Sequence, residues 1–246
     1  MGLFFVYLLL FCNLRIVFCY NGTVFVGQIS EHQSKTLTIN KILLSFAVVL
    51  LGAAGCMAQN VKLPAPQKKG GKTIVETLWD RQSGTEFSDK MLSQQDLSDL
   101  LFAAIGVNRE NGKLTSPTAS NKQEIRLFVF TAEGVSEYLN GENSLKPLVT
   151  GDHRALIAGR QEWVKSAPVV LLIAADEKKF GRNDERAKTM MAVDAGIVCE
   201  NINMFCAGTG LVTRPRASMD TEAVRKLLQF DDSLTPILNN PVGYPK

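Results

Sequence analysis

The sequence predicts an α+β fold with a central mixed β-sheet flanked by helices. Three observations carry this prediction. Helical patterns come first along the chain, strand patterns follow, and one long helix precedes the last strands. Residues 169–174 form a continuous apolar run, which is typical of a strand covered on both faces. Residues 185–207 are mostly apolar over a length that strands do not reach, and they therefore form a helix.

Two helices open the folded part of the chain. Residues 73–80 carry apolar side chains at helical spacing, among them Trp79, which we place in the core together with Trp163. Ser93 is an N-cap residue for a second helix over 93–105, whose apolar positions also recur at helical spacing. Both segments are therefore expected to bury one face.

The middle of the chain alternates between strand and helix. Residues 125–131 alternate and are rich in strand-forming side chains, and the buried strand 169–174 follows. The long helix 185–207 is interrupted by polar residues such as Asp194, which argues against a membrane span. We expect it to be buried over much of its circumference, and such burial requires a large subunit interface.

Three short elements complete the domain. A strand is expected near 211–213, after the glycines that end the long helix. Asp220 is the N-cap of a helix over 220–228, and a last strand lies near 235–242. We find no internal repeat and no low-complexity tract.

An export signal is predicted for residues 41–58. A lysine is followed by an apolar core of about the right length and then by small residues. Two exits compete: cleavage after Ala58, or lipid attachment at Cys56, whose three preceding residues resemble a lipobox. The protein is therefore expected to be exported, either as a periplasmic protein or as a membrane-anchored lipoprotein.

The predicted domain boundaries follow from this signal. Residues 1–40 contain a second apolar run, and two export signals in series make little physical sense, so we interpret them as a spurious or disordered leader. A genuine membrane anchor is the alternative. Residues 59–72 combine prolines, glycines and lysines and are predicted to be a linker, with no defined fold before about Lys72. The domain is assigned to 73–246.

Composition excludes several function classes. The net charge is +3 with both signs spread along the chain, which does not favour a nucleic-acid partner. Of five cysteines, only Cys199 and Cys206 lie in the domain, and we expect both to be packing residues. With His32 in the leader, His153 is the one histidine of the domain, so we assign no metal site and no catalytic side chain.

Two short segments carry the most chemical information. Residues 81–87 (RQSGTEF) place an arginine and a hydroxyl at neighbouring turn positions, which suits a phosphate. Residues 116–123 (SPTASNKQ) place an asparagine and a glutamine in a small-residue loop, which suits the edge of a heteroaromatic ring. Taken alone, Arg81 and Ser83 fit a solvated helix end as well, and Asn121 fits a turn.

The order of these segments resembles the nitroreductase family. The likeness runs from about Lys72 to Lys246 and includes Arg-x-Ser, Pro-x-Ala-x-Asn-x-Gln, Ala-Pro before a buried strand, the long helix, Gly-x-Gly-Leu and a final Pro-x-Gly-Tyr-Pro. The stretch 100–109 (LLFAAIGVNR) and the motif Asn121-x-Gln-Glu at 121–124 are closest to the branch that includes the azoline-peptide oxidases. The resemblance implies a nitroreductase-like fold with the long helix at a homodimer interface.

The resemblance also implies a cofactor, flavin mononucleotide (FMN), bound at each end of the subunit interface. The matching positions for its phosphate and ribityl chain are Arg81, Gln82 and Ser83. Asn121 and Gln123 would face either the ring or the ribityl chain from the partner subunit. The turn 208–213, which ends at Thr213, would place backbone amides near the ring nitrogen that accepts hydride, and Lys246 would lie near the phosphate.

One of the implied flavin residues departs from the family pattern. Thr85 stands where the family usually has a lysine or arginine that stabilises the reduced ring, so another cation, Arg214 or Arg216, is the candidate replacement. The printed sequence has no residue after Lys246 to serve as a further phosphate ligand.

The resemblance implies a flavin-dependent oxidoreductase. It would transfer hydride through FMN from an NAD(P)H-type donor to an acceptor such as a nitroaromatic or a quinone. The alternative is a non-catalytic flavin-binding or scaffold protein that keeps the fold, for which Thr85 is the best evidence. Reduced nicotinamides are scarce outside the cytoplasm, so export leaves the donor open.

Overall fold

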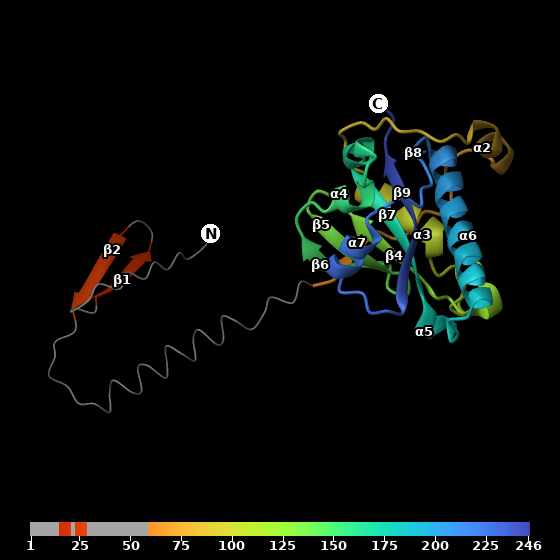
Figure 1. The fold of residues 1–246 in the computed structure, drawn as a ribbon. Helices are drawn as coiled ribbons and strands as arrows, with labels where there is room; N and C mark the ends of the chain where they lie inside the picture. Colours follow the sequence, from red (N-terminus) through yellow and green to blue (C-terminus); the bar gives the residue numbers. More distant parts are fainter. Residues whose placement is uncertain (1–14, 21–22, 29–58) are drawn as a thin grey trace. The chain divides into compact units, whose positions relative to one another are not determined.

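The computed structural model describes residues 15–20, 23–28 and 59–246 (Figure 1). The chain divides into two compact units, one within the first 57 residues and one from Ala58 to Lys246. In the first unit, β1 (Arg15–Tyr20) and β2 (Thr23–Gln28) form an antiparallel hairpin, in a region where we expected no defined structure. The predicted export signal at 41–58 lies outside the described residues and stays a prediction.

The second unit contains a seven-stranded sheet in the order β3-β6-β5-β4-β7-β9-β8. The α+β class is confirmed, but every strand pair is antiparallel, so the sheet is not mixed. The reason is that β4, β5 and β6 are successive strands joined by tight turns, and β7 and β9 add beside them in alternating directions. The strands are β3 (Val61–Lys62), β4 (Ile125–Phe130), β5 (Gly134–Leu139), β6 (Ser144–Thr150), β7 (Val169–Asp176), β8 (Val212–Thr213) and β9 (Leu234–Gly243).

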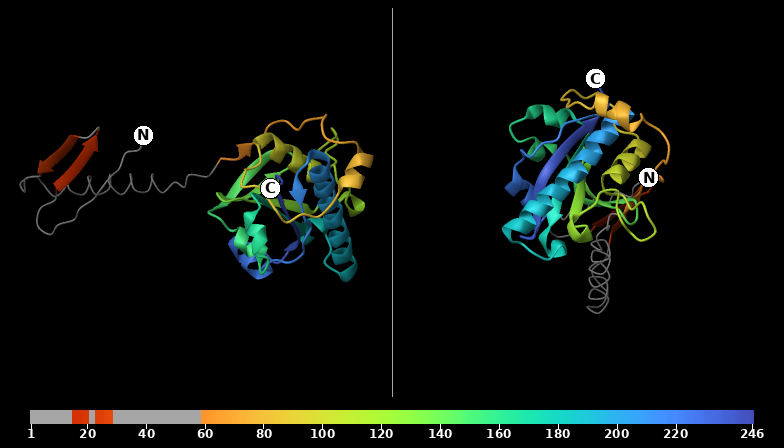
Figure 2. Two further views of the ribbon diagram at one scale, coloured as in Figure 1. Left: turned by 90° about the horizontal axis from the view of Figure 1, so that it is seen from above. Right: turned by 90° about the vertical axis from the view of Figure 1, so that its right-hand side faces the viewer.

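Helices cover both faces of this sheet (Figure 2). They are α2 (Ile74–Asp80), α3 (Gln94–Ile105), α4 (Arg154–Ala158), α5 (Glu177–Phe180), α6 (Glu185–Thr209) and α7 (Thr221–Leu227), with 3-10 turns η1 (Ala119–Asn121) and η2 (Glu162–Ser166).

Strand β7 lies at the centre of the core. Its alternate residues, such as Leu171 and Ile173, join a hydrophobic cluster with α3 and α6, whereas Val170 and Leu172 join a second cluster with α4 and α7. The predicted strand covered on both faces is therefore confirmed.

Helix α6 packs one face on the sheet. Asp184 caps its first turn by accepting a hydrogen bond from the Ala187 amide at 2.9 Å, and Gly210 ends it in the left-handed conformation. The helix is long and apolar enough to cross a membrane, yet Asp194 is among its buried residues, which marks a core helix. Within one chain the burial is one-sided, because Val193 remains 51% exposed. The predicted burial around most of the circumference is not seen in the isolated chain.

The segment 59–72 is part of the domain, so the prediction of a linker is wrong. Val61 and Lys62 extend the sheet beside β6, and the Leu63 side chain is only 5% exposed. Hydrogen bonds to the body follow along the segment. The amides of Leu63, Gln67 and Lys72 donate to the Asn143 carbonyl, the Asp99 carboxylate and the Gly208 carbonyl, respectively. The Pro64 carbonyl accepts hydrogen bonds from the Ser98 and Asn143 side chains. The prolines and glycines of this segment allow it to follow the surface of α3 and α6, and they do not make it a flexible linker.

Helix α2 presents an apolar surface to solvent. A capping box between Thr73 and Glu76 begins the helix. Trp79, which we expected in the core, is 86% exposed. Trp163 is partly buried and stacks on Phe87 with ring centroids 6.2 Å apart. The other exposed apolar residues of α2 are Ile74, Val75 and Leu78.

Candidate functional site

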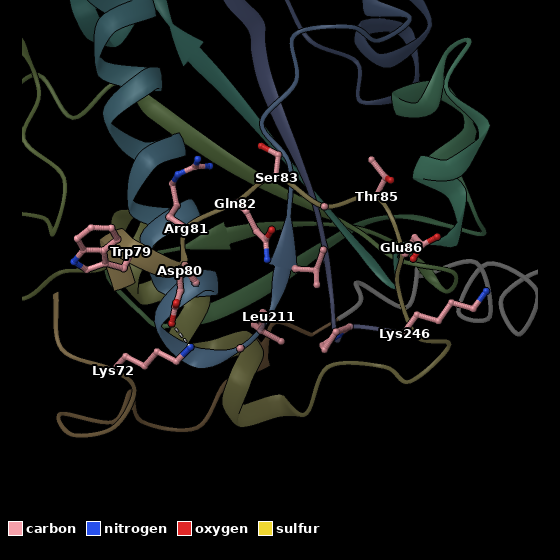
Figure 3. A pocket seen from close by; sticks show the side chains of 15 residues that line it. Lys72, Trp79, Asp80, Arg81, Gln82, Ser83, Thr85, Glu86, Leu211 and Lys246 are labelled. Atoms are coloured by element: carbon pink, nitrogen blue, oxygen red, sulfur yellow. Dashed lines mark hydrogen bonds and ion pairs between the residues drawn. The ribbon is translucent and has the colours of Figure 1, made fainter. Parts of the chain in front are cut away.

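A pocket of about 830 Å³ opens where α2 ends, beside the last turn of α6 (Figure 3). Its volume lies in the range of small-molecule sites, which is about 300–1,000 Å³. The segment after α2, the turn before β8 and the last two residues of the chain form its walls. The pocket brings together five of the predicted cofactor residues, namely Arg81, Gln82, Ser83, Thr85 and Lys246.

Backbone contacts fix the segment that carries four of these residues. The Gly84 amide donates to the Thr213 carbonyl at 3.0 Å, and Phe87 forms a bridge with Pro245. A Cβ atom on Gly84 would lie 2.4 Å from Cγ1 of Val212, so only glycine lets the segment approach β8 this closely. The chain is held here through its backbone, and its side chains remain available to a ligand.

The polar side chains of the pocket have unused hydrogen-bonding capacity. Within residues 59–246, Arg81, Gln82 and Ser83 make no side-chain hydrogen bond or ion pair to the protein, whereas Lys72 pairs with Asp80 at 2.6 Å. Lys246 is also unpaired among the described ion pairs. Two unpaired cations, a hydroxyl group and an amide group in the lining of one pocket suit an anionic ligand group such as a phosphate.

Thr213 lies beneath the pocket, not in its wall. Its side chain is buried and donates to the Pro241 carbonyl at 2.9 Å, while Asn240 donates to its hydroxyl at 3.2 Å. The Thr213 carbonyl is the acceptor that holds Gly84. Its observed role is therefore to position the segment 81–87, and sequence reasoning gave no signal of this role.

Asn121 and Gln123 lie far from this pocket within the chain. The turn that carries them contacts α6 near Asp194, 13 residues before the pocket residue Ala207, which corresponds to about 20 Å along the helix. Gln123 donates from Nε2 to the Gly112 carbonyl at 3.1 Å. One chain alone does not unite the two predicted parts of the site.

Arg216 is committed to the core, and it is not a free cation at the pocket. It is 6% exposed and donates to the carbonyls of Ile157 and Ala158, and to the Gln161 and Asn239 side chains. Burial, with a smaller effect of the neighbouring Arg214 charge, lowers the pKa of Arg216. The guanidinium group thus satisfies carbonyls at the end of α4.

Comparison with known sequences identifies the family. Residues 79–244 match the description "Nitroreductase family" over most of the domain. The chain belongs to the nitroreductase family. This match spans the pocket segment 81–87, helices α3 to α7 and all the strands of the seven-stranded sheet except β3. Nitroreductase-family proteins are generally flavin-dependent oxidoreductases, so the resemblance drawn from the sequence is confirmed at the level of the family.

Individual relatives agree with the nitroreductase assignment. A protein assigned as a nitroreductase in Methanocaldococcus jannaschii is 29% identical over 180 residues, covering 69% of this chain and 90% of the relative. A crystal structure assigned likewise, from Ralstonia eutropha, has a TM-score of 0.73 at 28% identity and covers 79% of this chain and 93% of that one.

A more distant structural likeness concerns the fold alone. A chain of the Escherichia coli microcin synthetase complex with bound truncated precursor has a TM-score of 0.59 at 16% identity, over 88% of this chain and 100% of that one.

Proposed function

We propose that this nitroreductase is an exported FMN-dependent oxidoreductase that passes hydride from an NAD(P)H-type donor to an acceptor such as a nitroaromatic or a quinone. The single observation that carries the proposal is the pocket at the end of α6, whose lining includes the unpaired side chains of Arg81 and Ser83 (Figure 3). FMN, when bound, supplies the hydride-carrying ring, and the protein supplies binding, orientation and electrostatics.

The residues of the pocket fit the phosphate end of this cofactor. A guanidinium group presents a planar fork of donors that matches phosphate oxygens, so Arg81 is the principal anion ligand. Ser83 and Gln82 add neutral hydrogen-bonding groups, and Lys246, which also lines the pocket, adds a second positive charge. Thr85 offers only a hydroxyl, so Arg81 and Lys246 are the charges available to stabilise negative charge on the ligand.

The second part of the site comes from another copy of the chain. Asn121 and Gln123 are about 20 Å along α6 from the pocket, so in a two-fold dimer they can reach the pocket of the partner. The exposed apolar surface of α2 supports this arrangement, since such patches mark interaction sites. Nitroreductase-family proteins are commonly dimers.

A complementation experiment tests the shared site. Arg81→Ala and Asn121→Ala chains are each expected to bind FMN poorly, because each pure dimer carries the same defect in both pockets. Unfolding and refolding them together makes half of the dimers mixed, and each mixed dimer has one intact pocket. About one quarter of the sites should then recover. No recovery would place Asn121 outside the partner's pocket.

The location of the enzyme is proposed from the export signal at 41–58, with cleavage after Ala58 or lipid attachment at Cys56. Export favours an electron donor other than cytoplasmic NAD(P)H or a secreted substrate that is itself oxidised. The second candidate function, a flavin-binding protein without turnover, is favoured by one observation, the absence of a charge at Thr85.

The visible absorption spectrum of the purified protein tests the cofactor. We expect flavin bands and about one FMN released per chain. Arg81→Ala should weaken FMN binding by about 1.5–3 kcal/mol, the cost of losing a charge-assisted contact, whereas Arg160→Ala, an exposed arginine outside the pocket, should not. No bands after incubation with excess FMN would reject the proposal. Anaerobic loss of the flavin colour on addition of NADH or NADPH would support the enzyme over the flavin-binding protein without turnover. A flavin that dithionite reduces but nicotinamides do not would leave both candidates open, because an enzyme that uses another donor would give the same result.

A further inference from the structure

Two carboxyl groups are buried together between the start of β4 and helix α6. Glu124 is 0% exposed and Asp194 is 3% exposed. Asp194 accepts a hydrogen bond from the Ala119 amide at 2.8 Å, but within residues 59–246 neither carboxyl oxygen of Glu124 has a hydrogen-bond donor. A buried carboxylate without a donor is strongly disfavoured, so this group requires a proton.

Asp194 is the natural acceptor for that proton. Burial, together with contact with the Asp194 carboxyl group, raises the pKa of Glu124 to about 7, although the Glu124 backbone amide has the opposite effect. Of the charged groups that face Glu124, Asp194 comes from α6 and Lys179, which has the opposite effect, comes from α5. A protonated Glu124 can donate to Asp194, and the pair then carries one negative charge instead of two.

The turn beside this pair is strained. Ser120, Asn121 and Gln123 adopt positive φ values of 52°, 54° and 51°, which non-glycine residues rarely adopt. Such backbone persists only when surrounding contacts determine it. The Ala119 amide bonded to Asp194 is the hydrogen bond that connects the turn to α6 in the described part of the chain. Loss of that bond would leave the strained turn free to relax.

We propose that one proton shared by Glu124 and Asp194 locks the turn 118–123 in the conformation that presents Asn121 and Gln123 to the flavin pocket of the second subunit. Glu124 is thus a positioning residue. The inference rests on the proposed function for the purpose of the turn, but the lock itself is a property of the protein without ligand.

The direction of the pH effect follows from linkage. The locked turn binds the Glu124 proton more tightly than a released turn, in which the pKa returns to its ordinary value of 4.5. Locking is therefore strongest below pH 4.5 and declines as pH rises through about 7, because both carboxyls then carry charge. From these two values, the equilibrium between locked and released turn changes about tenfold between about pH 6 and pH 8.

Hydrogen exchange of the full, FMN-free chain tests the lock. After correction for the intrinsic rate, peptides covering 117–124 should lose protection about tenfold from pH 6 to pH 8. Glu124→Gln should keep its protection at both pH values, since the amide donates to Asp194 without titrating. Asp194→Asn is a second variant, in which an amide that does not titrate can donate to Glu124. It should behave in the same way. Glu137→Gln is the control, because the largely buried Glu137 is paired with Arg126 at 2.7 Å; it should keep the wild-type pH dependence.

Two results would overturn the lock: pH-independent protection in the wild type, or unchanged pH dependence in both Glu124→Gln and Asp194→Asn. FMN titration of the same proteins separates the lock from its purpose. Affinity that falls about tenfold from pH 6 to pH 8 in the wild type, but not in Glu124→Gln, supports the link to the flavin pocket. FMN affinity that is equal at both pH values overturns that link. A failure of FMN to bind at any pH rejects the proposed function, and the exchange result still decides on the lock.

Discussion

Replacing Gly84 by alanine tests the geometry of the pocket directly. The new Cβ would stand 2.4 Å from Cγ1 of Val212, whereas ordinary contact begins at 3.4 Å, so about 1 Å of overlap must be relieved. Relief requires either rotation of the valine side chain, at about 0.5–1.5 kcal/mol, or a shift of the segment away from β8. A shift would break the hydrogen bond from the Gly84 amide to the Thr213 carbonyl.

We expect Gly84→Ala to cost about 2 kcal/mol, which is the middle of the range for overpacking. If the segment moves, the same free energy is lost from FMN binding, and the Kd for FMN rises about 30-fold. Val212→Ala removes the clashing methyl group, so the double variant should recover to within about 0.5 kcal/mol of Val212→Ala alone. Gly141→Ala is the matched control, because a Cβ there meets nothing within 4 Å.

Urea unfolding and FMN fluorescence titration measure the two components separately. Equal behaviour of Gly84→Ala and Gly141→Ala in both assays would refute the steric argument. A double variant that remains as weak as Gly84→Ala would show that the damage does not arise at Val212.

Three further predictions concern the core. Leu63→Ala should lower the free energy of unfolding by about 2–4 kcal/mol in urea, because the side chain is 5% exposed; a linker residue would show no change. Arg216→Met should cost about 3 kcal/mol in the same assay, since the acceptors of four hydrogen bonds lose their buried donor, and Arg214→Met, at an exposed position, should cost less than about 0.5 kcal/mol. Burial raises the pKa of Cys199 to about 11 and also raises that of Cys206. Treatment of the native protein with iodoacetamide at pH 8 should therefore leave both cysteines unlabelled in peptide mass spectra. Rapid labelling would contradict their burial.

The elements with strong local signals were predictable from sequence. Helices α2, α3 and α7 begin after the N-cap residues Thr73, Ser93 and Asp220, each with its side chain bonded to the first turn. Cap chemistry and helical periodicity act over a few residues, so one segment contains the whole signal. The buried strand β7 was recognisable for the same reason, because both of its faces are apolar.

The hairpin of β5 and β6 was not predicted, because Pro147 lies within β6. Proline normally excludes a central strand. Here β3 pairs only with Ser144 and Leu145, so the outer side of β6 is unpaired at Pro147, and the next residue, Leu148, is a bulge in β6 between the pairs Ser136–Pro147 and Val135–Val149. The sequence does not show how short the neighbouring strand is, and that shortness is what makes the proline acceptable.

The parts of the candidate site were predictable, but their spatial relation was not. Arg81 and Ser83 lie in one turn, so their proximity follows from the sequence. Asn121 reaches the neighbourhood of α6 only through tertiary packing, and its distance from Arg81 depends on the length of that helix between their contacts. The burial of Arg216 could not be predicted from the sequence for a similar reason, because the acceptors of its hydrogen bonds come from distant parts of the chain.

If the chain carried a lipid at Cys56, the docked segment 59–72 would also determine how far the domain could stand from a membrane. Cys56, the proposed lipid attachment point, is five residues before Val61, the first residue of β3. Fully extended, five residues span at most about 18 Å. A lipid at Cys56 would therefore hold the outer edge of the sheet close to the headgroups, whereas a true linker to residue 72 would have tripled the reach. Such an enzyme would sample electron donors dissolved in or bound to the bilayer more readily than those in the bulk phase.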